Sequence, residues 1–212
     1  MMMLLAAVLL VLLNAFFVIA EFSLVKIRRT RLEELVQQDN KRATLALKIV
    51  DSFDTYLGAT QLGITLSSLA LGWIGEPAVS FLLKPLLEAY FPNDPWFLTL
   101  ASIASGFTVI TFLHIVLGEL VPKSMAIQRA ESLALFVAWP LYIFHKLGYP
   151  VIALFHFTAR IILRMMGLKA TSETELAHSE DELRLIVSAS HRGGVLDQME
   201  SEIIDNVFDF AD

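Results

Sequence analysis

The chain of 212 residues contains no cysteine, and charged residues make up only 18% of it. The absence of cysteine excludes a disulfide-stabilised scaffold, a thiolate metal site, an iron–sulfur cluster and a cysteine nucleophile. A typical soluble domain has roughly 25% charged and 45–50% apolar residues, whereas this chain is 56% apolar with a mean hydropathy of +0.62. This composition excludes intrinsic disorder and argues against an ordinary soluble globule.

Catalytic motifs are also missing from the sequence. It has no glycine-rich phosphate loop, no His-Glu metal-binding helix motif and no nucleophile elbow. His145 and His156 have no acidic partner at the spacing of a metal-binding helix. We therefore expect a protein that is not an enzyme and has no ATP site in this chain. The basic residues between 26 and 42 are better explained as a topology signal than as a nucleic-acid patch, so no nucleic-acid partner is expected.

Long apolar runs are the main feature that the sequence does contain. Residues 1–20 are apolar except for Asn14, and a bilayer core of about 30 Å requires roughly 20 such residues in a helix. Two further runs cover residues 57–74, without a charge, and 96–117, where His114 is the sole ionisable residue. The pattern predicts an all-α polytopic membrane protein with three transmembrane helices in a lipid bilayer.

The positions of lysine and arginine predict the orientation. Cations follow the first and third apolar runs, at Lys26, Arg28, Arg29, Arg31, Lys123 and Arg129. Lysine and arginine mark the cytoplasmic side of a membrane protein. We therefore expect the N-terminus and the proline-containing connection 75–95 to lie outside the inner or plasma membrane. A cleaved signal peptide is disfavoured because the cations follow the apolar run instead of preceding it.

The segments outside these runs predict helices at the membrane surface. Apolar residues recur at helical spacing among charges in 32–53, which indicates an amphipathic helix on the cytoplasmic surface. In 132–163, Pro140 and Pro150 help to divide the chain into two apolar pieces that are too short to span comfortably. We interpret these pieces as an interfacial or re-entrant helical pair, with a single tilted fourth span as the alternative.

The end of the chain differs in character from the rest. Residues 173–212 contain eleven acidic residues and two basic ones. Segment 179–182 (SEDE) forms a capping box that predicts a helix ending at Gly193 and Gly194, and a second helix with one apolar stripe follows. We expect a transmembrane domain of residues 1–170 and an acidic cytosolic helical hairpin of residues 171–212. The chain stops almost at the end of this second helix. We therefore expect that a further domain either was removed or was never present.

Polar residues inside the apolar runs are candidate functional residues, because an ionisable group costs roughly 2.5–3.5 kcal/mol at the bilayer centre. Three stripes could together line a water-accessible cavity: Asn14 with Glu21; Gln61, Thr65, Ser68 and Gly72; and Thr108, Thr111, His114 and Gly118. Simpler interpretations compete with this one. Hydroxyl residues such as Thr60 and Ser67 commonly bond to helix backbone, Glu21 lies near Lys26, and His114 is a candidate for helix packing.

The segment around Glu119 has a specific chemical character. Pro122 lacks an N–H group, and its ring clashes with the preceding turn, so backbone carbonyls near Gly118 are freed and the helix is expected to break. A carboxylate beside free carbonyls and hydroxyls provides hard oxygen ligands, which suit Mg²⁺ or a similar cation.

Five segments carry a resemblance to a known family. In chain order they are 20–24 (AEFSL), 28–32 (RRTRL), 59–65 (ATQLGIT), 117–124 (LGELVPKS) and 207–212 (VFDFAD). Over essentially its whole length the chain resembles the transmembrane domain of the CNNM/CorC family, also called HlyC/CorC or hemolysin-like proteins. The most specific segment contains Gly118, Glu119, Pro122 and Lys123.

The resemblance implies a homodimer with three spans per chain, a belt of juxtamembrane helices and an acidic linker. In the family this linker leads to paired CBS domains that bind adenine nucleotide; that pair is absent from this chain. The family is associated with Mg²⁺ transport, thought to be export coupled to Na⁺ entry. The ion is held between the spans by hydroxyl, amide, carbonyl and carboxylate oxygens.

The sequence also departs from the family pattern. Val18, Ile19 and Ala20 precede Glu21 where magnesium-transporting members resemble Ser-Gly-Ser-Glu, and Ile64-Thr65 replaces a pair of asparagines. Our leading hypothesis is a divalent-cation transporter, with Mg²⁺ as the foremost candidate and Na⁺ as a possible coupling ion. Its expected ligands are Glu119, Gly118, Glu21, Ser23, Thr65, Gln61 and Asn14, with Pro122 and Lys123 at the helix break. The alternatives are transport of another cation or a polyamine, and a non-transporting membrane module for regulation or interaction.

Overall fold

The computed structural model describes residues 2–89, 94–167 and 180–209. These residues are almost entirely helical and include no strand, which confirms the predicted all-α class. Contacts divide the chain into two compact units, Met1–Ala159 and Arg160–Asp212. Each unit is described by itself below.

The first unit begins with a long helix, two short helices and a second long helix. They are α1 (Met2–Lys26), α2 (Arg29–Gln37), α3 (Lys41–Val50) and α4 (Phe53–Glu88). The single amphipathic helix expected between the first two runs is therefore two helices. The chain turns between α2 and α3 at Asp39, which has a positive φ of 61°.

A third long helical run follows. It consists of α5 (Pro95–Leu113), a π-helical segment η1 (His114–Leu120) and α6 (Val121–Gln128), and it packs along α4 and α1. The sequence predicted that the helix breaks at Pro122. The helix instead continues through this residue, with a widened π-helical turn before it. The next helix, α7, covers Ala130–Met165.

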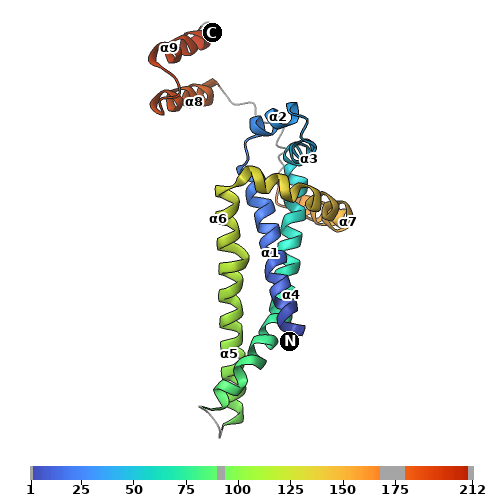
Figure 1. Ribbon diagram of the computed structural model, residues 1–212. Helices are drawn as coiled ribbons and strands as arrows, with labels where there is room; N and C mark the ends of the chain where they lie inside the picture. The colour runs from blue at the N-terminus through green and yellow to red at the C-terminus, as the bar shows by residue number, and fades with distance from the viewer. Residues whose placement is uncertain (1, 90–93, 168–179, 210–212) are drawn as a thin grey trace. The chain divides into compact units, whose positions relative to one another are not determined.

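α4 extends further than the sequence predicted. Residues 75–88 were expected in a connection rich in proline, yet they form the last turns of α4, with Pro77 and Pro85 inside the helix. Membrane helices tolerate proline where neighbouring helices compensate for the lost hydrogen bond. Here α5 packs against α4 along this stretch, and α4 bends towards it (Figure 1). Tertiary packing has overridden the local proline signal.

α7 is one continuous helix with Pro140 and Pro150 in its interior, so the predicted division into two helices is wrong. It runs crosswise to α1 and α5 at the end of the bundle that carries α2 and α3 (Figure 1). By length and composition, four helical runs could cross a membrane: Met2–Lys26, Phe53–Glu88, Pro95–Gln128 and Ala130–Met165.

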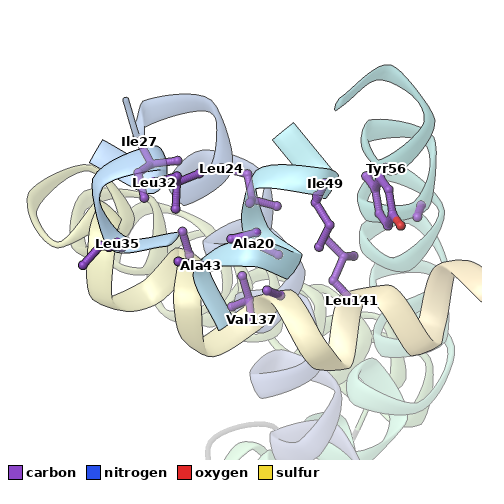
Figure 2. Close-up of a cluster of buried hydrophobic side chains, with 14 of the residues drawn as sticks. Ala20, Leu24, Ile27, Leu32, Leu35, Ala43, Ile49, Tyr56, Val137 and Leu141 are labelled. Carbon is purple, nitrogen blue, oxygen red and sulfur yellow. The ribbon is translucent and has the colours of Figure 1, made fainter. Parts of the chain in front are cut away.

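The largest apolar core of the first unit lies at this α2–α3 end. Leu32 of α2 and Ile49 of α3 are fully buried against Leu24 of α1, and α7 contributes Val137 and Leu141 (Figure 2). An ion pair reinforces the contact, with Arg31 Nε 2.9 Å from Glu131 Oε2. Hydrogen bonds from Arg31 to Glu131 and Glu34 raise the pKa of the guanidinium, which stays charged.

The second unit contains the last residues of α7, from Arg160 to Met165, together with α8 (Glu180–Arg192) and α9 (Gln198–Asp209). The two helices pack together after a turn at Gly194, whose φ is 72°. Arg184 lies 5.5 Å from the ring centroid of Phe208. This is the predicted helical hairpin. The side chains of the capping box at 179–182 and the expected domain boundary at 170/171 lie outside the described residues.

Candidate functional site

Apart from Ser102 of α5, the described polar side chains that are buried in the first unit lie on α1 and α4. Asn14, Ser23, Thr60 and Ser67 are each at most 1% exposed. A buried polar group is costly unless its hydrogen bonds are made inside the protein. Their partners therefore define the candidate site.

Asn14 lies at the centre of this region. Its Nδ2 donates to the carbonyl oxygen of Gly118 at 3.0 Å, and its Oδ1 lies 3.2 Å from Ser67 Oγ and 3.1 Å from Ser68 Oγ. Ser68 Oγ is also 3.3 Å from Nε2 of His114. These four side chains and the Gly118 carbonyl are called the Asn14 cluster below. The cluster joins α1, α4 and η1.

Pro122 explains why the Gly118 carbonyl is available to Asn14. A proline has no N–H to donate to the carbonyl four residues earlier, which here belongs to Gly118. The chain adopts the π-helical turns of η1 immediately before α6. π-helical insertions of this kind are frequent at functional sites. A side chain at residue 118 would be crowded, because a Cβ there would lie 2.9 Å from His114 and 3.3 Å from Asn14 Nδ2.

The cluster satisfies its own hydrogen bonds. Ser67 Oγ donates to the Gly63 carbonyl at 2.6 Å. With the proton of His114 on Nε2, a chain of donors runs from His114 through Ser68 to the Asn14 carbonyl oxygen. Three oxygens thereby lie together, from Asn14, Ser67 and Ser68, and the oxygen of Gly118 lies at the nitrogen of the same Asn14 amide. All are uncharged hard ligands of the kind that Ca²⁺ and Mg²⁺ use.

The carboxylate of Glu21 lies further along α1. Glu21 is seven residues from Asn14, which corresponds to about 10 Å along the helix. Thr60 Oγ1 is 3.3 Å from Glu21 Oε2, and Lys123 is a nearby cation. The Lys123 ammonium also lies 4.4 Å from the ring centroid of Phe22. The hydrogen bond to Glu21 thus comes from α4, and the described contacts include no ion pair between Glu21 and Lys26.

The other predicted ligands lie elsewhere. Gln61 and Thr65 are exposed and line a cavity of about 480 Å³ between α4 and α7. Ser23 is buried but bonds to Ala20 of its own helix at 3.4 Å. Glu119 is exposed and is not in the Asn14 cluster. Of the predicted set, the structure joins Asn14 and Gly118 directly. Among the described residues, no three histidine, aspartate or glutamate side chains form a metal-binding group.

Three residues for which the sequence analysis weighed a simple helix-packing role are part of these contacts: Thr60, Ser67 and His114, the last of which it also placed in a candidate polar stripe. A signal for two of them was present. Thr60 and Ser67 are seven residues apart, as are Asn14 and Glu21. Two antiparallel helices that place Asn14 beside Ser67 therefore also place Glu21 beside Thr60, as observed.

Glu76 is a further residue that the sequence analysis did not single out, because it lay in the expected connection. The structure places it within α4, where its Oε1 is 2.6 Å from Ser80 Oγ. Ser80 Oγ also lies 2.9 Å from the carbonyl oxygen of Ser102 on α5. This contact ties α4 to α5 at the end of the bundle opposite α2 and α3.

Comparison with known proteins agrees with this architecture. The family described as "Cyclin M transmembrane N-terminal domain" matches residues 5–200. UPF0053 protein YhdT of Bacillus subtilis (strain 168) is 44% identical over 201 residues, which are 95% of this chain and 43% of that protein. UPF0053 protein YrkA of the same organism is 42% identical over 202 residues, covering 95% of this chain and 46% of the relative.

A more distant relative shows the same pattern. UPF0053 protein sll0260 of Synechocystis is 33% identical over 204 residues, covering 96% of this chain and 45% of the relative. The chain thus spans less than half the length of these relatives. The family match, the long apolar helices and these identities lead to one conclusion: the chain belongs to the CNNM/CorC family and carries its transmembrane domain.

Proposed function

We propose that this chain is the membrane domain of a divalent-cation transporter, with Mg²⁺ as its foremost substrate and Na⁺ as the coupling ion for export. The observation that carries the proposal is the Asn14 cluster. It places four uncharged oxygens, including a backbone carbonyl of the π-helical segment η1, between apolar helices. Mg²⁺ prefers oxygen ligands and retains several waters, so an incomplete set of protein oxygens suits it.

Glu21 supplies the charge that draws a cation towards this cluster. It is an ionisable group at one end of an apolar helix, and such groups characteristically mark ion pathways. Thr60 contacts its carboxylate, and seven residues of α1 place it about 10 Å from Asn14. A cation entering from the α2–α3 end would pass Glu21 before it reaches Asn14. The positive-inside rule places this end in the cytoplasm and the N-terminus outside, so the direction is outward.

The proposed assembly is a homodimer in the cell membrane. In the full-length family architecture, CBS domains follow the acidic hairpin, and nucleotide regulation belongs to that part. Transport itself is proposed for the membrane domain, where alternating access would expose the Asn14 cluster to one side and then the other.

The test is thermal unfolding of the purified protein in detergent, titrated with Mg²⁺, Ca²⁺, Mn²⁺, Na⁺ and spermidine. A ligand that binds only the folded state stabilises it by about 2.7 kcal/mol at a hundredfold excess over its dissociation constant. We expect a selective Mg²⁺ shift that is lost in Asn14→Leu and reduced in Ser68→Ala. Gln61→Leu changes an exposed residue of α4, the helix that carries Ser68, and should retain the shift.

Other outcomes contradict specific parts of the proposal. An unchanged Mg²⁺ shift in Asn14→Leu would reject the cluster as the site. Loss of the shift in Glu119→Gln would instead assign the charge to Glu119, as the sequence-based hypothesis predicts. A shift with spermidine alone would indicate a polyamine transporter. No shift with any cation, together with no flux in liposomes, would indicate a non-transporting membrane module.

A further inference from the structure

Two adjoining cavities lie at the α2–α3 end, between α3, the start of α4 and α7. Their volumes are about 450 Å³ and 310 Å³, and both are lined by Lys48 and Tyr142. The combined site is called the lysine–tyrosine pocket below, after Lys41, Lys48, Lys146, Tyr142 and Tyr149. It is separate from the Asn14 cluster and from every contact proposed for cation transport.

The charge of this pocket is of one sign. Three lysines line it, and no aspartate or glutamate is among the described residues that do so. Asp51 lies nearby in the sequence, but it is paired with Arg29 at 3.0 Å. Hydroxyl groups of Ser52 and Thr55 add hydrogen-bond donors to the wall. Such a set of ammonium and hydroxyl donors fits a phosphate group.

His145, which lines the larger cavity, provides an independent indication that the structure lacks a ligand here. Its ring packs against Tyr56, with centroids 4.4 Å apart, and against Tyr149 at 5.9 Å. Its Nε2 is the one buried side-chain nitrogen or oxygen without a hydrogen-bond partner in the described part of the chain. Native proteins rarely leave such a group unsatisfied unless a water, ion or ligand completes it.

The surroundings of the pocket indicate where its ligand comes from. Trp139 and Tyr142 line the smaller cavity, and tryptophan and tyrosine concentrate at the level of lipid headgroups. Further along α7, Ile143 and Leu147 are exposed, the latter at 78%. The pocket therefore opens beside a surface that fits lipid acyl chains, with its cations at the edge.

We propose that the lysine–tyrosine pocket binds the phosphate group of an anionic phospholipid headgroup. Lys48 and Lys146 supply the charge, and the exposed apolar side chains of α7 contact the acyl chains. The ligand class follows from the combination of cations, aromatic residues and an adjoining apolar surface, because a soluble phosphate would need only the first of these. Bound lipid would join α3 to α7, whereas the ion pair between Arg31 and Glu131 joins α2 to α7.

The chain allows a direct test because it has three tryptophans, of which Trp73 and Trp96 lie outside this pocket. In a Trp73→Phe/Trp96→Phe background, Trp139 alone reports on its surroundings. The protein is reconstituted into vesicles of phosphatidylcholine and phosphatidylglycerol, with one lipid carrying brominated chains that quench tryptophan fluorescence. Quenching at varied lipid ratios gives the relative binding constant of the two lipids. Phosphatidylcholine has the same phosphate, but its choline cation neutralises it.

We expect the relative binding constant to favour phosphatidylglycerol by more than about fivefold, the effect of roughly one lysine near an anionic surface. It should fall several-fold in Lys48→Gln/Lys146→Gln, since two of the three lysine charges that line the pocket are then lost. All four lysines that are substituted in the test are exposed, so the variants should fold. The matched control, Lys26→Gln/Lys84→Gln, removes two charges that do not line the pocket and should keep the preference.

A further arm separates the two sources of phosphate. Sodium phosphate or glycerol 3-phosphate is added to vesicles that contain phosphatidylglycerol, and competition that lowers the lipid preference supports recognition of the phosphate group. A change in Trp139 emission with soluble phosphate, without any lipid preference, would overturn the assignment to lipid. The proposal is also overturned if the preference is absent, or if it is equal in the pocket variant and the control.

Discussion

At the residue scale, Gly63 shows how one position sets the distance between two membrane helices. A Cβ at residue 63 would lie 2.5 Å from atoms of the Phe17 ring, which is closer than packed atoms come. Phe17 is 3% exposed and cannot move freely, because its ring also contacts Phe144 with centroids 4.7 Å apart. Small residues at helix contacts allow backbones to approach closely in membranes. The approach at Gly63 brings Asn14 within reach of Ser67.

We predict that Gly63→Ala destabilises the protein by about 1–3 kcal/mol, as overpacking of a tight core does. The matched control is Gly72→Ala on the same helix, where nothing lies within 4 Å of the added Cβ. That substitution should stabilise the helix by about 0.5–1 kcal/mol, because alanine loses less conformational freedom than glycine. Unfolding in mixed detergent micelles measures both. Equal effects of the two substitutions would show that helix propensity, not the contact with Phe17, decides the result.

At the element scale, the run α5–η1–α6 accommodates proline without interrupting the helix. η1 (His114–Leu120) widens the turn before Pro122, and the Gly118 carbonyl bonds to Asn14 of another helix. The carbonyl that lacks a hydrogen bond within its own helix is thus used in a contact between two helices. α4 and α7 also continue through prolines, but Pro77, Pro85, Pro140 and Pro150 lie outside the Asn14 cluster.

We predict opposite effects of Pro122→Ala on stability and on cation binding. The new N–H can donate to the Gly118 carbonyl, so the unfolding free energy should rise by about 1–3 kcal/mol. The same bond competes for the carbonyl that is proposed to face the cation, so the Mg²⁺-induced thermal shift should shrink.

The control for this experiment is Pro77→Ala, which removes an exposed proline from the interior of α4. It should raise stability in the same way and leave the Mg²⁺ shift unchanged. Both quantities come from thermal unfolding with and without Mg²⁺. A reduced shift in both variants would mean that general stiffening of the helices, and not the Gly118 carbonyl, changes cation binding.

At the scale of the whole molecule, the chain combines two units of different chemistry. The first contains the apolar helices, the Asn14 cluster and the lysine–tyrosine pocket, and the second contains the hairpin α8–α9. Each has its own internal contacts, as independent folding units do. The eleven acidic residues between 173 and 212 belong to the second unit. The boundary between the two units is therefore also a boundary in charge.

We predict that a chain ending at Gly167 keeps the helical content of the first unit, its thermal midpoint and its response to Mg²⁺. The contacts of Asn14, Glu21 and the core at α2 and α3 all come from residues before 160. Circular dichroism and thermal titration of the shortened chain in detergent check this. A lower midpoint, or loss of the cation response, would show that the acidic hairpin stabilises the membrane domain.

Much of the fold could be predicted because it depends on local composition. A long apolar run without charges is expected to be helical in a bilayer, because a helix satisfies all backbone hydrogen bonds within one segment. The first apolar run predicted α1, and the change to acidic, amphipathic sequence predicted the hairpin. The extents of α4 and α7 were missed, because proline is a local signal and packing against neighbouring helices overrides it.

The sequence by itself determined the helical class, the membrane character, the acidic tail and the freeing of the carbonyl near Gly118. Only the tertiary structure decided which polar residues meet. α1 and α4 are apolar on nearly every side, so periodicity does not define their contact faces. The face was set by the antiparallel packing of Phe17 against Gly63, which turns Thr60 and Ser67 inward and leaves Gln61 and Thr65 outward. The rotation of each helix about its axis depends on contacts between segments that are distant in the sequence, so it cannot be predicted from a local sequence pattern.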